Sequence, residues 1–161
     1  MSTATKDHCD RWRPSLKPFE ITLDGSAIAV RQALAEVLEA LTPLELGIEE
    51  RSVVELVLAE VLNNVVEHAY DAANQERGIC LRCNQRADGL HLHVIDAGHR
   101  MSDQMLPFAK PPPITDNLAD LPEGGFGWFL IRDLAKDICY AREAGKNHLR
   151  LRLAIATRLL G

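Results

Sequence analysis

The sequence predicts an α+β protein, specifically a two-layer α/β sandwich in which a mixed, mostly antiparallel sheet carries its helices on one face. Apolar residues recur at helical spacing in 26–41 and 48–70. In 79–96 and 138–155 they alternate with polar residues on either side of a turn, as in β-hairpins. Strand and helix do not alternate along the whole chain, so a Rossmann fold is not expected.

The individual elements follow in order along the chain. A strand is predicted at 19–24, and Ser26 is suited to cap a helix that runs through Leu41. A second helix begins after Gly47 and extends to about Tyr70 or Ala73. The strands of the first hairpin meet at the turn 87–89, and a last helix is predicted at 128–136. Strands at 138–142 and 149–155, joined by a turn at 144–147, complete the chain. The apolar face of the first helix is expected to comprise Ile28, Leu34, Val37, Leu38 and Leu41.

Length and composition indicate one globular domain. The 161 residues are enough for a single core, and 47% apolar with 25% charged residues is ordinary. We expect an irregular segment at 1–17 and a domain at 18–161, with a long loop at about 99–123 that serves as a lid. The net charge of −5 argues against broad nucleic-acid binding. No stretch is apolar enough for a membrane span or a signal peptide, so a cytoplasmic protein is expected.

Metal binding through cysteine and histidine is poorly supported. The CxxC formed by Cys80 and Cys83 has no second pair, and all four cysteines are interpreted as free thiols. His91 and His93 have a spacing that could bind zinc, but no third ligand is evident. Their strand face is predicted to point away from the helices into solvent. The same exposure, without a catalytic role, is expected for Arg150 and Arg152.

Three polar clusters stand out from the core pattern. Glu60, Asn64 and His68 are four residues apart, which puts them on one face of the second helix. Taken alone, this row is better explained as the solvent boundary of an amphipathic helix. The second cluster is Asp96-Ala97-Gly98, at the end of a strand. The third is Gly124-Gly125-Phe126-Gly127, at the start of a helix.

The chemistry of the three clusters is complementary. Glycines that lead into a helix expose backbone N–H groups that bind anions, aided by the helix dipole. A carboxylate at a strand end can accept a hydrogen bond from an exocyclic amine. A glutamate and an asparagine on one helix face can activate a hydroxyl and hold a hard cation through oxygen. Together the clusters predict a nucleoside-triphosphate site.

Three motifs carry a resemblance to a known family. AEVLNNVVEHAY is similar to the N box of the GHKL ATPases, and VIDAGHRM and PEGGFGWFLIRDL are similar to their two glycine boxes. The resemblance covers about residues 19–155 and implies the Bergerat ATP-binding fold. It is strongest for the small branch of anti-sigma factors that are also serine-protein kinases. One departure is that His99-Arg100 follows Gly98, where the family often has a second glycine.

The resemblance implies ATP and Mg²⁺ as cofactors and assigns roles residue by residue. Glu60 is the general base or polarises the attacking hydroxyl, and Asn64 coordinates Mg²⁺. Asp96 accepts a hydrogen bond from the adenine amino group, and Gly98 allows the base to approach closely. The ribose and phosphates are bound by His68 and by the backbone of Gly124, Gly125, Phe126 and Gly127.

The implied function is an ATP-dependent serine/threonine protein kinase of the anti-sigma-factor type. Its substrate would be a STAS-type anti-anti-sigma protein, and phosphorylation would control partner switching. No histidine-bearing dimerisation helices precede the domain, which disfavours a histidine kinase. The alternative is an ATP-binding regulatory module that sequesters a sigma factor or another regulator without turnover. The resemblance leaves a homodimer open, and neither nucleic acid nor a membrane is an expected partner.

Overall fold

The computed structural model describes residues 16–68, 78–101 and 126–155. In these ranges each predicted element is present. The helices and strands are β1 (Phe19–Asp24), α1 (Ala27–Ala40), the short 3₁₀ helix η1 (Thr42–Leu44), α2 (Ile48–His68), β2 (Gly78–Arg86), β3 (Gly89–Asp96), α3 (Phe126–Leu134), β4 (Lys136–Glu143) and β5 (Lys146–Leu153).

The five described strands form one sheet in the order β1-β2-β3-β5-β4. Every neighbouring pair is antiparallel, so the sheet has no parallel component among the described strands, although a mixed sheet was predicted. β3 lies at the centre, and the two predicted hairpins, β2–β3 and β4–β5, meet where β3 pairs with β5. The fold class predicted from the sequence is confirmed.

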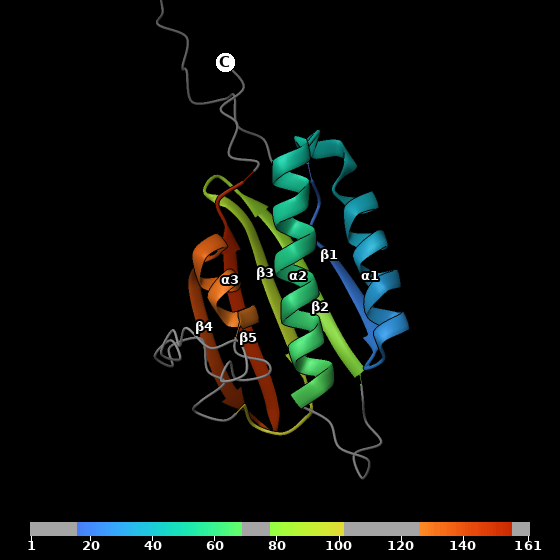
Figure 1. Cartoon of the computed structure of the whole chain (residues 1–161), viewed down its shortest axis with the longest axis vertical. Coiled ribbons are helices and arrows are strands. Elements are labelled where there is room, and N and C mark those ends of the chain that lie inside the picture. The colour runs from blue at the N-terminus through green and yellow to red at the C-terminus, as the bar shows by residue number, and fades with distance from the viewer. Residues whose placement is uncertain (1–15, 69–77, 102–125, 156–161) are drawn as a thin grey trace, which may run out of the picture.

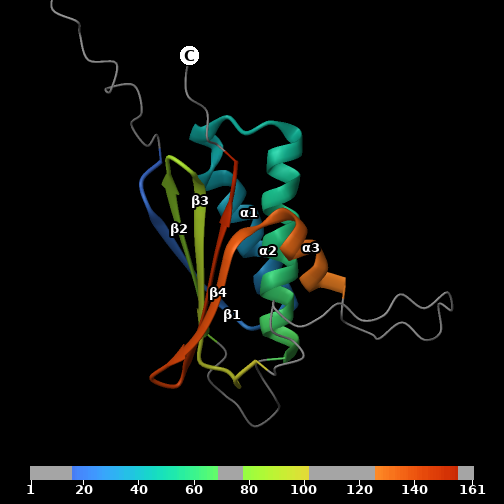
Figure 2. The same cartoon turned by 90° about the vertical axis from the view of Figure 1, so that its left-hand side faces the viewer.

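The three α-helices cover one face of the sheet and leave the other face open (Figures 1 and 2). α2 packs between α1 and α3. The core lies between the helices and the sheet, and side chains from all three helices and from the strands contribute to it. None of the helices in the described ranges is long and apolar enough to span a membrane.

The starts of α1 and α2 follow from local chemistry. The Ser26 side chain accepts a hydrogen bond from the Ala29 N–H at 3.2 Å, as predicted for an N-cap. At the start of α2 the Gly47 N–H donates to the Glu50 carboxylate at 3.0 Å, which is the reciprocal half of a capping box. Glu49 and Glu50 also place negative charge at the positive end of the helix dipole.

The predicted apolar face of α1 was wrong at Ile28, whose side chain is 71% exposed. The buried stripe of this helix begins at Val30 and continues through Ala33, Val37 and Leu38. At 100° per residue, position 28 lies about 200° from position 30 and therefore on the opposite side of the helix. Ile28 is apolar, but it does not share the period of the core residues.

The bounds of the last three elements also differ from the predicted ones. α3 begins at Phe126, two residues before Trp128, so Gly127 belongs to the helix. The turn of the last hairpin is only two residues, Ala144 and Gly145, both with positive φ (49° and 76°). This tight turn lets the last strand begin at Lys146 instead of Leu149. The structure describes α2 as far as His68, so its predicted extension to 70–73 lies outside the described residues.

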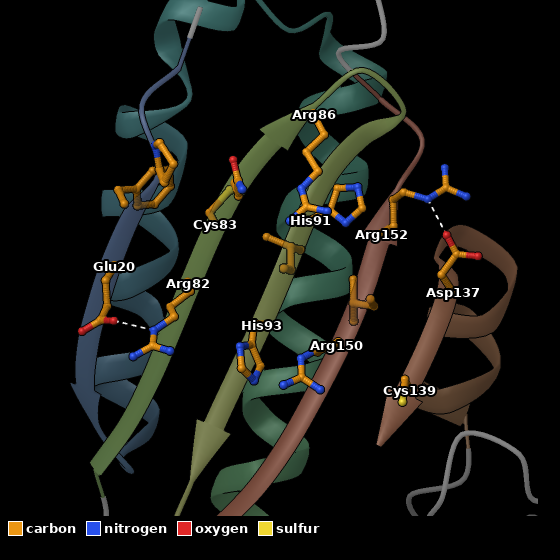
Figure 3. Close-up of a pocket in the computed structure, with 15 residues that line it drawn as sticks. Glu20, Arg82, Cys83, Arg86, His91, His93, Asp137, Cys139, Arg150 and Arg152 are labelled. Atoms are coloured by element: carbon orange, nitrogen blue, oxygen red, sulfur yellow. Dashed lines mark hydrogen bonds and ion pairs between the residues drawn. The ribbon is translucent and has the colours of Figure 1, made fainter. Parts of the chain in front are cut away.

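The alternation along β3 separates two kinds of side chain. Leu92, Val94 and Asp96 are buried on the helix-covered face, and His93 lies on the open face (Figure 3), as predicted. Cys83 is buried toward the helices, and burial raises the pKa of its thiol to about 12, which makes it unreactive. The described cysteines are free thiols, in agreement with the prediction.

Candidate nucleotide site

The polar row on α2 does not behave as a uniform solvent boundary. Asn64 is 8% exposed and therefore buried, Glu60 is half-buried, and the His68 side chain is 39% exposed. His68 ends the described helix and lies 3.7 Å from the Glu67 carboxylate. The structure therefore groups Glu60 with Asn64 and leaves His68 at the surface.

The start of α3 packs closely against this part of α2. A Cβ added to Gly127 would clash with the Glu60 carboxylate and lie 3.5 Å from the Asn64 amide nitrogen. A larger residue at this position would displace the Glu60 carboxylate, so glycine here keeps the start of α3 close to the polar row of α2. Of the other predicted glycine-box residues, Gly124 and Gly125 lie outside the described residues, and Phe126 is described only as the first residue of α3.

The buried amide of Asn64 has an unused donor. Within the part of the chain that the structure describes, its Nδ2 has no hydrogen-bond partner. Leaving a buried polar group unpaired costs about 1–3 kcal/mol, so such a group marks a position where a ligand atom stabilises the protein. A phosphate oxygen would be a suitable acceptor, and an amide oxygen is a ligand that Mg²⁺ accepts. The residues present thus fit a magnesium nucleotide.

Asp96 lies at the C-terminal end of β3, at the same end of the molecule as the C-terminus of α2 (Figures 1 and 2). Its carboxyl group is only 5% exposed. One oxygen, Oδ1, accepts hydrogen bonds from the Gly98 N–H at 2.9 Å and from Asn147 Nδ2 at 2.8 Å. Burial raises the pKa of the Asp96 carboxyl, and these two hydrogen bonds oppose the increase.

Asn147 is the centre of a hydrogen-bond network that holds Asp96. It pairs with Asp96 across β3 and β5, and it is buried on the same face. Its Oδ1 accepts from the Tyr140 hydroxyl and from the Arg142 guanidinium, each at 2.7 Å. Its Nδ2 also donates to the His99 carbonyl at 2.8 Å. We refer to Asp96, Gly98, Tyr140, Arg142 and Asn147 as the Asp96 network.

The network also holds the segment that follows β3. Arg142 Nη1 donates to the Gly98 carbonyl at 2.9 Å, and the Met101 N–H donates to the Tyr140 hydroxyl at 3.1 Å. The β4–β5 hairpin therefore fixes the backbone on both sides of His99. Residues 99–101 are thereby bound to the sheet, and the remainder of the predicted lid lies outside the described residues.

Three residues of the network, Asn147, Tyr140 and Arg142, were not predicted as site residues. The sequence of β5 could have indicated a role for Asn147, because buried and exposed residues alternate along this strand. Leu149, Leu151 and Leu153 are buried on its covered face, and Asn147 continues that period with a polar residue. A polar residue in the place of a core leucine needs buried partners, and it therefore predicts a network.

The open face contains no cluster of three metal-ligating side chains among the described residues, so a zinc site on His91 and His93 lacks support.

The arginines of β5 were both predicted to be exposed on this face. The prediction is confirmed for Arg150 and wrong for Arg152. The Arg152 side chain is 19% exposed, because it bonds to Asp137 at 2.6 Å and contacts Asp88 at 3.5 Å.

Comparisons with known proteins identify the family and the fold of this chain. The model of the histidine kinase-like ATPase domain matches residues 22–153, so the chain belongs to this family, and the predicted resemblance is confirmed. ATP is the nucleotide that an ATPase domain implies. A search of curated proteins gives no significant match.

A solved structure with a similar fold is the crystal structure of the RsbU and RsbW domains of Rv1364c from Mycobacterium tuberculosis. The TM-score is 0.59 with 22% sequence identity over 90% of this chain, a level of similarity that shows the fold. The chain spans 35% of the length of that solved chain.

Proposed function

We propose that this protein is an ATP-dependent serine/threonine protein kinase of the anti-sigma-factor type. The proposed substrate is a small STAS-fold anti-anti-sigma protein, and the two would act together in partner switching. Membership of the histidine kinase-like ATPase family supports the nucleotide part of this proposal. The motifs around Glu60, Asp96 and Gly127, which resemble the kinase branch, support the phosphotransfer part.

The observation that carries the proposal is the state of the Asp96 carboxylate. Both of its described hydrogen bonds use Oδ1, and Oδ2 has no donor within the described residues. The free oxygen suits the exocyclic amine of adenine, and the bonds to Gly98 and Asn147 fix its direction. Asn147 is proposed as the residue that positions Asp96, a role that the family motifs did not assign.

The remaining residues divide the work of phosphotransfer. Asn64 would hold the bound Mg²⁺, which supplies positive charge to the phosphates of ATP. Glu60 would accept the proton of the substrate hydroxyl as that oxygen bonds to the γ-phosphorus, while the bond to the β–γ bridging oxygen breaks and ADP leaves. Because the reaction depends mainly on positioning and charge, the close contact of Gly127 with Glu60 and Asn64 would set the relative placement of phosphates and base.

Adding a phosphate to the partner introduces a charge of about −1.5 to −2, which is enough to disrupt a closely packed interface. This charge is the proposed basis of switching. Incubation with Mg-ATP and candidate STAS-fold proteins, followed by detection of phosphoserine or phosphothreonine, tests the activity. ATP binding without transfer to any cognate partner would favour the alternative, a module that sequesters a sigma factor or another regulator.

The substitution Asp96→Asn tests the nucleotide site directly. An amide cannot provide the charged acceptor, and a hydrogen bond to a charged group contributes about 1.5–3 kcal/mol, so ATP affinity should fall by tenfold or more. Isothermal titration calorimetry measures this change. Asp24→Asn, at an exposed position at the end of β1, is the matched control. Unchanged affinity in Asp96→Asn would contradict adenine recognition by this residue.

A further inference from the structure

The open face of the sheet contains a groove of about 650 Å³ that extends across all five strands (Figure 3). Its lining includes Glu20 on β1, Arg82 on β2, His93 on β3, Arg150 on β5 and Cys139 on β4. Asp96 and Asn147 face the opposite side of the sheet, toward the helices. The groove is therefore separate from the candidate nucleotide site.

Positive charge is concentrated in this groove, although the chain as a whole has a net charge of −5. Four arginines from β2 and β5 line it, and we refer to it as the arginine groove. Two of them have carboxylate partners, because Arg82 bonds to Glu20 and Arg152 bonds to Asp137, each at 2.6 Å. The other two, Arg86 and Arg150, form no ion pair within the described residues. In Figure 3 Arg86 lies near the β2–β3 turn, and Arg150 lies farther along the sheet beside His93.

His93 separates the cations in the middle of the groove. It pairs with Arg82 on β2 and with Arg150 on β5, so the three residues form a row across adjacent strands. Burial, and then the positive charges of Arg150, His148 and Arg82, lower the pKa of the His93 ring to about 4. The ring is therefore neutral at pH 7, and it lies within hydrogen-bond distance of the His148 ring, at 3.1 Å.

We propose that the arginine groove binds an acidic segment of a partner protein. Guanidinium groups bind carboxylates through two parallel hydrogen bonds, and Arg86 and Arg150 are available for such pairs. The neutral imidazole of His93, beside Arg150, leaves room for an apolar or polar residue of the same segment. This surface lies on the face opposite the nucleotide site, so a partner bound there would leave the proposed site accessible.

The charges in the groove favour a polypeptide over other anions. Glu20 and Asp137 lie at its two ends and would repel a continuous phosphate backbone, whereas a peptide carries its charges at separate positions. A second copy of this chain, placed face to face, would bring the same four arginines against each other, and opposed like charges destabilise an interface. The volume of the groove is within the range of sites that hold a few residues of a ligand.

The test uses the full-length protein and a fluorescein-labelled oligoglutamate peptide, with binding followed by fluorescence anisotropy. The double variant Arg86→Gln with Arg150→Gln should bind at least tenfold more weakly than the unmodified protein, because two charge-assisted contacts are lost. The matched control is Arg31→Gln with Arg51→Gln, which removes the same charge from exposed positions on the helices. The control should retain nearly full peptide binding.

Four results would overturn the proposal. They are absence of peptide binding to the unmodified protein, equal weakening in the control, tighter binding of an oligodeoxythymidine than of the peptide, and self-association that the groove variant abolishes in sedimentation. ATP binding, measured in parallel, should be unchanged in both double variants. This measurement separates failure of the groove from failure of the proposed nucleotide site.

Discussion

The two buried polar clusters on the helix-covered side differ in how their hydrogen bonds are satisfied. In the Asp96 network, carboxylate, amide, hydroxyl and guanidinium groups bond to each other and to the backbone of residues 98–101. In the α2 row, Asn64 retains an unpaired amide nitrogen, and Glu60 has no described hydrogen bond to another side chain. Within the described residues the first cluster is bonded except at Asp96 Oδ2, whereas the second has few hydrogen bonds of its own.

This contrast has an energetic meaning. An extensively bonded network around a buried carboxylate stabilises the fold and holds its members in one geometry. A cluster with unused groups contributes less to folding and is available for a reaction. We therefore expect substitutions in the Asp96 network to change the free energy of unfolding, and substitutions in the α2 row to change catalysis.

The largest effect is expected for Glu60→Ala. Loss of a general base lowers a transfer rate by about a hundredfold or more, while ATP affinity and the free energy of unfolding should change little. Phosphotransfer to a cognate partner, calorimetry with ATP and chemical denaturation measure the three quantities. Glu55→Ala, an exposed glutamate on the same helix, is the control. Transfer at the unmodified rate in Glu60→Ala would remove this residue from the mechanism.

Asn147→Ala is expected to lower the free energy of unfolding, the quantity that Glu60→Ala should leave nearly unchanged. The truncation deprives the buried Asp96 carboxylate, the Tyr140 hydroxyl and the Arg142 guanidinium of a partner. Each of these groups keeps one other described hydrogen bond, and only Asp96 is buried. The main loss is one buried hydrogen bond to a charged group, so the free energy of unfolding should fall by about 1.5–3 kcal/mol. Urea denaturation measures the change, with Asn84→Ala on the open face as the control. A variant as stable as the unmodified protein would show that the network does not support the fold.

The smallest effect is expected at His93, which belongs to neither cluster. Its pKa is about 4 in the folded protein against 6.5 ordinarily, so the unfolded chain binds more protons between these values. Stability should therefore be complete above pH 6.5 and fall as the pH drops toward 4. Because the ring is partly exposed and screened by water, the loss should be about 1 kcal/mol.

The His93→Gln variant should have a flatter stability profile between pH 6.5 and 4. Arg150→Gln should give an intermediate profile, because it removes the second-largest cause of the pKa shift. Thermal unfolding across this pH range, together with NMR titration of the ring, measures both effects. A ring that titrates at its ordinary value would contradict the burial of His93.

The positions of predicted site residues could be anticipated where the surrounding residues follow a regular strand or helix repeat. Asp96 follows Leu92 and Val94 on a buried strand face, and Glu60 and Asn64 repeat at helical spacing, so local geometry was sufficient to place them. Ile28 was misplaced because an apolar residue was assigned to the core without the period that the core requires. His68 follows the same four-residue spacing as Asn64, but it lies at the end of the described helix, where less of the fold covers it.

The sequence by itself determined the two-layer architecture, the hairpins and the family, because these depend on periodicity and on motifs that are local in the chain. Only the tertiary structure showed that Asn147 bonds to Asp96, 51 residues away, and that Gly127 packs against Glu60. It also brought the four arginines of β2 and β5 together on one open face. These features depend on which strands and helices become neighbours, and strand register decides that only when the whole sheet forms.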